Sequence, residues 1–90
     1  MREIRVATAQ FENRDNDTQY NLSRIESLAR QAVEQGAEIV SFHEGCIPAY
    51  SWIQPLDKPE LLEVAELVPD GPSVSRLSQI ARQLKAVIMA

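Results

Sequence analysis

The sequence predicts an α/β fold in which short strands alternate with helices and pair in parallel. Three apolar runs have the length and the β-branched content of strands, and two longer stretches repeat apolar residues at helical spacing. A strand, a helix and a second strand joined by tight connections are typical of a parallel sheet. We therefore expect a βαβ unit, then a loop, then an αβ unit.

The composition is that of a chain that folds around one core. Of the 90 residues, 44% are hydrophobic and 24% are charged, which excludes collagen-like and wholly disordered chains. The net charge is −4 and the basic residues are spread along the chain, so we expect no nucleic-acid partner. One cysteine and one histidine are too few for a zinc site, and we expect no metal. With no signal-peptide pattern and no long apolar run, we expect a cytoplasmic protein with no membrane partner.

The first half of the chain is organised as a strand, a helix and a strand. Residues 4–9 are rich in small and β-branched side chains and predict the first strand. A polar cluster at residues 13–17 provides turn and cap residues for a helix at residues 18–35, which Gly36 follows as a left-handed cap. Residues 39–42 form an apolar run between glycines and predict a buried strand. The apolar stripe of the helix consists of Leu22, Ile25, Leu28, Ala29, Ala32 and Val33.

The second half begins with a loop and ends in a strand. Residues 45–58 contain prolines and aromatic residues and predict a loop, and residues 59–67 predict a short helix. Ser73 is the expected N-cap of a helix that continues to Lys85, and residues 87–90 begin a third apolar strand. Because the sequence stops within that strand, we expect the N-terminal part of a longer chain.

The carboxyl end of the second strand is the expected position of a functional site. Open α/β sheets gather functional residues at this edge, and Glu44 follows the strand there. The aromatic side chains of Tyr50 and Trp52 in the next loop could wall a pocket. The residues alone leave other interpretations open: a solvated carboxylate at Glu44, and a hydrophobic plug made by the two aromatics.

A local catalytic triad of Cys46, His43 and Glu44 is not expected. If the chain stays extended, alternation places Glu44 and Cys46 on one side and His43 on the other. Triad members normally come from distant parts of a sequence. We therefore interpret Cys46 as a small pocket or core residue and His43 as a structural or solvent-facing residue.

Four segments together resemble the nitrilase (carbon–nitrogen hydrolase) superfamily. They are residues 6–10 (VATAQ), 35–38 (QGAE), 39–44 (IVSFHE) and 69–73 (PDGPS), and the resemblance covers essentially all 90 residues. The family strand typically ends in Phe-Pro-Glu, and this sequence has His43 where the family has proline. It also has Ala49-Tyr50 where Gly-Tyr is common, which leaves the substrate subclass more open.

The resemblance implies a fold and a reaction. The fold is an α-β-β-α sandwich, of which residues 1–90 would be a partial domain, the N-terminal third. The reaction is hydrolysis of a small-molecule amide, carbamoyl compound or nitrile by a Glu-Lys-Cys triad, with an amidase or N-carbamoyl amide hydrolase expected. Glu44 would be the general base, with Tyr50 and Trp52 as candidate substrate-binding residues.

The resemblance also implies what lies outside the segment. The lysine and the nucleophilic cysteine would follow residue 90, so the 90-residue piece alone would be inactive. No metal or organic cofactor and a homo-oligomer are expected for the full-length enzyme. A different class of function stays open from the residues themselves: a small non-catalytic α/β module that binds a ligand or a partner.

Overall fold

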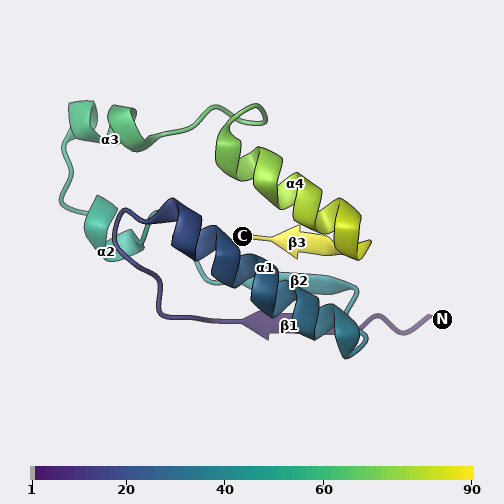
Figure 1. Cartoon of the computed structure of the whole chain (residues 1–90). Helices are drawn as coiled ribbons and strands as arrows, with labels where there is room; N and C mark the ends of the chain where they lie inside the picture. Colours follow the sequence, from purple (N-terminus) through teal and green to yellow (C-terminus); the bar gives the residue numbers. More distant parts are fainter. Residues whose placement is uncertain (1) are drawn as a thin grey trace.

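The computed structural model describes residues 2–90, and its centre is a parallel sheet of three strands (Figure 1). The strands are β1 (Val6–Ala9), β2 (Ile39–Phe42) and β3 (Val87–Met89), in the order β1-β2-β3. Ala9 of β1 lies opposite Phe42, and Met89 of β3 lies opposite Ser41. The predicted α/β class and the parallel pairing are confirmed.

Two helices cover one face of this sheet. The helices α1 (Thr18–Glu34) and α4 (Pro72–Leu84) lie side by side over the strands (Figure 1). Side chains alternate along a strand, so every second residue of β2 faces the helices. The core between the two layers is therefore built from both elements, and its buried members include Ile25, Ala29, Val40, Phe42 and Ile80.

The opposite face of the sheet is apolar and open. Val6, Val87 and Met89 are each more than half exposed, with relative accessibilities of 58%, 55% and 56%. A parallel sheet normally has both of its faces covered. The residues that the structure describes thus form one helical layer and one strand layer.

The ends of α1 follow the sequence expectation. The Asp17 side chain caps the helix by accepting a hydrogen bond from the backbone N–H of Tyr20 at 3.1 Å. Gly36 follows the last turn with φ +97°, a left-handed conformation that glycine adopts without the steric cost of a side chain.

The start of α4 differs from the expectation. Gly71 is the N-cap and Pro72 is the first helical residue, so the prediction of Ser73 as N-cap was wrong. Ser73 lies inside the first turn, where its backbone N–H donates to the Glu66 carboxylate at 2.6 Å and its hydroxyl donates to the same group. An acidic side chain seven residues upstream therefore satisfies donors at this helix end.

Two short helices lie beyond the carboxyl ends of the strands (Figure 1). The helix α2 (Tyr50–Ile53) lies within the segment predicted to be a loop, and α3 (Lys58–Val64) starts one residue earlier and ends three residues earlier than expected. Asp57 and Glu60 form a reciprocal capping box at the start of α3. Among residues 2–90, no helix has both the length and the apolar character needed to cross a membrane.

Candidate active site

Glu44 lies at the carboxyl edge of the sheet, two residues after the end of β2. All three strands are parallel, so they end at the same edge, on the side where α2 lies (Figure 1). The Glu44 side chain is exposed at this edge. The structure thus places the candidate catalytic carboxylate where open α/β sheets present functional residues.

The chain turns sharply after β2, over residues 44–48. Gly45 has φ +67°, and a Cβ atom built on it would lie 2.9 Å from the Cβ atom of Tyr50. The Ala49 N–H closes the turn by donating to the Gly45 carbonyl at 3.0 Å, and Ala49 itself has a left-handed φ of +75°. Glycine at position 45 therefore allows both the tight turn and the close approach of Tyr50.

The turn brings one predicted aromatic residue against Gly45, which directly follows the candidate base. Tyr50 packs against Gly45, the neighbour of Glu44, and is half exposed. Trp52 lies two residues further along α2 and is partly buried. Both residues thus lie on a short helix that follows directly from the Glu44 turn, and Tyr50 is the one that approaches Gly45 in that turn.

Cys46 is a core residue and not an accessible thiol. Its relative accessibility is 2%, and burial raises the pKa of the Cys46 thiol above its ordinary value. The thiol is therefore protonated at neutral pH, and only the thiolate is an effective nucleophile. The turn at residues 44–48 also removes the extended geometry that would place Glu44 and Cys46 on one side.

His43 packs against an aromatic ring. Its imidazole lies edge-on to Phe11, with 5.1 Å between ring centroids, and its Nδ1 atom is buried without a hydrogen-bond partner in the part of the chain that the structure describes. The contact lies between the end of β2 and the segment that follows β1. This arrangement fits a structural histidine.

Two asparagines that the sequence analysis did not single out contact the Glu44 turn. Asn13 Nδ2 donates to the Gly45 carbonyl at 3.1 Å, and Asn21 Nδ2 donates to the Ile47 carbonyl at 2.7 Å. Asn21 is fully buried next to the apolar stripe of α1. The one signal in the sequence that could have identified Asn21 was a polar residue directly beside the apolar stripe of a predicted helix.

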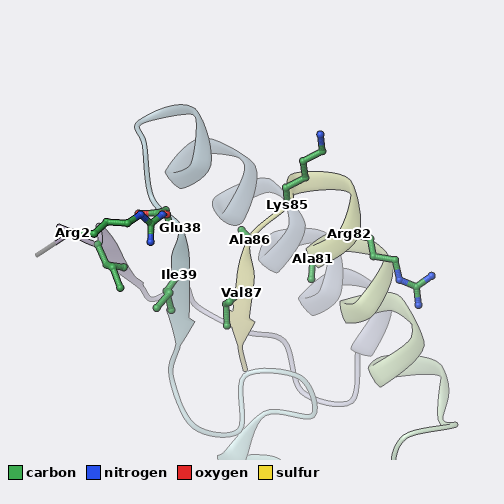
Figure 2. A pocket seen from close by; sticks show the side chains of 9 residues that line it. Arg2, Glu38, Ile39, Ala81, Arg82, Lys85, Ala86 and Val87 are labelled. Atoms are coloured by element: carbon green, nitrogen blue, oxygen red, sulfur yellow. The ribbon is translucent and has the colours of Figure 1, made fainter.

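A hollow of about 560 Å³ lies at the opposite, amino edge of the sheet (Figure 2). Arg2 and Glu38 lie together on one side of it and form an ion pair, whereas the charged ends of Arg82 and Lys85 point away. The lining residues are Arg2, Ile4, Glu38, Ile39, Ala81, Arg82, Lys85, Ala86 and Val87. This hollow is separate from Glu44 and from the aromatic residues of α2.

Comparison with known proteins identifies the family. The sequence pattern of the carbon–nitrogen hydrolase family matches residues 5–90, which includes all three strands and Glu44. A protein named nitrilase from Pyrococcus abyssi (strain GE5 / Orsay) is 28% identical over 87 residues, which are 97% of this chain and 32% of that protein. The chain therefore spans about a third of the length of the curated relative that it matches. The resemblance found in the sequence is confirmed, and the chain belongs to the carbon–nitrogen hydrolase family.

Proposed function

We propose that this chain is the N-terminal part of a hydrolase that cleaves non-peptide carbon–nitrogen bonds, with Glu44 as its general base. The observation that carries the proposal is the position of Glu44 in a member of this family. The carboxylate follows the central strand of a parallel sheet and is exposed at the carboxyl edge. A carboxylate at that edge can reach a substrate bound across the ends of the strands.

The chemistry requires a base, a nucleophile and a cation. A cysteine thiol loses its proton to the Glu44 carboxylate, and the thiolate attacks the amide carbonyl or the nitrile carbon. An amide substrate then releases ammonia and leaves a thioester, which a water molecule activated by Glu44 hydrolyses to the carboxylic acid and the free thiol. A lysine ammonium stabilises the oxyanion that develops in each step. Because Cys46 is buried and the pKa of its thiol is raised, we propose that the nucleophile follows residue 90. The catalytic lysine is proposed to follow residue 90 as well, as the resemblance to the family implies.

The proposed substrates are small amides, N-carbamoyl compounds or nitriles. An amidase or an N-carbamoyl amide hydrolase is our first choice, and the similar Pyrococcus abyssi protein carries the name nitrilase. Tyr50 and Trp52 are proposed to contact the substrate, because α2 follows directly from the Glu44 turn. The reaction as written needs no metal and no organic cofactor.

Residues 1–90 are proposed to be a partial domain of an α-β-β-α sandwich. The open face of the sheet supports this, because Val6, Val87 and Met89 are exposed and apolar. A second sheet from the rest of the chain would cover that face and complete the two inner layers. The full-length enzyme is proposed to be a homo-oligomer, and the 90-residue piece alone is proposed to be inactive.

The test is turnover by the full-length chain. Ammonia release is measured with three substrates of different class, a simple amide, an N-carbamoyl amino acid and a nitrile. Turnover of at least one of them is the expected result, and the preferred class assigns the subtype. If a folded full-length chain bound these compounds but released ammonia from none of them, the non-catalytic α/β binding module would be the better description.

A further inference from the structure

The turn that follows Glu44 is hydrogen-bonded to the β1–α1 connection and to the first turn of α1. Asn13 Nδ2 donates to the carbonyl of Gly45 at 3.1 Å and lies 3.5 Å from that of Cys46. Asn21 Nδ2 donates to the carbonyl of Ile47 at 2.7 Å. The backbone N–H of Asn16 donates to the carbonyl of Pro48 at 3.4 Å. The four carbonyls after Glu44 thus face donors from the β1–α1 connection and, at Ile47, from Asn21 in the first turn of α1.

The Asn21 side-chain amide both donates and accepts hydrogen bonds. Its Nδ2 atom donates both to Ile47 and to the carbonyl of Arg14, at 2.9 Å, and its Oδ1 atom accepts from the Arg14 N–H at 2.8 Å. The residue is fully buried, so water cannot replace these bonds. Only a side chain with two donors and an acceptor satisfies all three partners, and a carboxylate would face two carbonyl oxygens without a donor.

This geometry fixes Glu44 from both sides. On its amino side, β2 is held in the sheet, where Phe42 pairs with Ala9. On its carboxyl side, Asn13 donates to the Gly45 carbonyl and Asn21 donates to the Ile47 carbonyl. A catalytic carboxylate must be held to within about 0.5 Å of its productive position. Glu44 is exposed and lies on a loop, so the hydrogen bonds that Asn13 and Asn21 make to the following turn set its position.

We propose that Asn21 and Asn13 are positioning residues for Glu44. The inference rests on the proposed function, because it assigns the two amides a task only if Glu44 is the base. A purely structural role would stabilise the β1–α1 connection without affecting the chemical step. The two roles therefore differ in whether the loss of the amide lowers kcat.

The test compares Asn21→Asp, Asn13→Ala and a control in the full-length enzyme, with the small-molecule substrate that it turns over best. Asn21→Asp keeps the size and the acceptor but removes both donors. We expect kcat to fall about 10- to 100-fold with KM changed less than about threefold, since a misplacement of about 1 Å can cost about 10²-fold in rate. Amide hydrogen exchange at Ala49, whose N–H closes the turn, should become faster in the same variant. The matched control is Gln19→Glu, the same amide-to-acid change on an exposed residue of α1, which should leave kcat within twofold.

Asn13→Ala covers the case in which Asn21→Asp does not fold. Asn13 is only partly buried, so in Asn13→Ala water can hydrogen-bond to the carbonyls that lose the Asn13 amide. We therefore expect a smaller fall in kcat, of about 3- to 10-fold. A folded variant of either kind with faster exchange at the turn and an unchanged kcat would overturn the proposal. So would an unchanged rate of exchange at Ala49. Failure of the proposed function itself is distinguished by Glu44→Gln: if that variant keeps full activity, Glu44 is not the base, whatever the asparagine variants show.

Discussion

Glu26 joins the two helices that cover the sheet, and its replacement tests how they are held together. Its carboxylate accepts a hydrogen bond from Arg30 in the same helix at 3.2 Å and forms a second ion pair with Arg76 of α4. The two arginines hold the pKa of the Glu26 carboxyl below its ordinary value of 4.5, with Arg76 as the larger cause. The ionised form is therefore more stable in the folded chain than in the unfolded chain.

The size of the effect follows from the exposure of the partners. The Glu26 side chain is 25% exposed, but those of Arg30 and Arg76 are 50% and 44% exposed, so solvent screens both pairs. A pair four residues apart in a helix contributes about 0.3–0.5 kcal/mol, and an exposed pair between elements contributes at most about 1 kcal/mol. We expect Glu26→Gln to lower the free energy of unfolding by about 1 kcal/mol at pH 7.

The pH dependence has a defined sign. Because the folded pKa is lowered, the contribution of Glu26 is complete above the unfolded value of 4.5 and is lost as the pH falls through the lower folded value. The assay is urea unfolding of parent and variant, followed by circular dichroism at pH 7 and at pH 3. Glu34→Gln, an exposed carboxylate at the end of the same helix, is the control for the change of charge. A difference in unfolding free energy between parent and Glu26→Gln that is equal at both pH values would show that the ionised Glu26 carboxylate does not stabilise the fold. An effect no larger than that of Glu34→Gln would show the same.

Two further results are expected. Cys46→Ser in the full-length enzyme should keep most of kcat, because the Cys46 thiol is buried with a raised pKa and the proposed nucleophile lies elsewhere; complete loss of ammonia release in a folded variant would contradict this. The 90-residue chain alone should melt without a sharp transition and should associate as its concentration rises, because Val6, Val87 and Met89 leave an apolar sheet face open; a cooperative melt of a monomer in sedimentation experiments would count against it.

The parts of the fold that the sequence predicted are those encoded by local periodicity. The apolar stripe of α1 and the run of β2 are long or dense enough to define both elements, and the structure places α1 at Thr18–Glu34 and β2 at Ile39–Phe42. The glycine after α1 and the tight connection that follows it then require a parallel pair. The position of Glu44 at the carboxyl edge follows from the same pattern.

The parts that were missed depend on contacts between distant residues. The helix α2 has four residues and follows Ala49 with its left-handed φ, so neither its length nor its first residue gives a helical signal. The Glu66 carboxylate satisfies donors of Ser73 across a turn. Asn21 bonds to Ile47, a partner 26 positions away. No local pattern predicts such pairs, because the partners meet only after the chain has folded.

The role of Glu44 as general base is tested most directly by the kcat of Glu44→Gln in the full-length enzyme. Glutamine keeps the size of the side chain but cannot accept the thiol proton or activate water, and the loss of a general base costs about 10²–10⁴ in rate, or about 3–5 kcal/mol of barrier. Glu38→Gln is the matched control, because Glu38 lies at the amino end of β2, where it pairs with Arg2. We expect a fall of at least about 10²-fold in kcat for Glu44→Gln and almost none for Glu38→Gln. A kcat of Glu44→Gln within about threefold of the parent would contradict the assignment of Glu44 as the base.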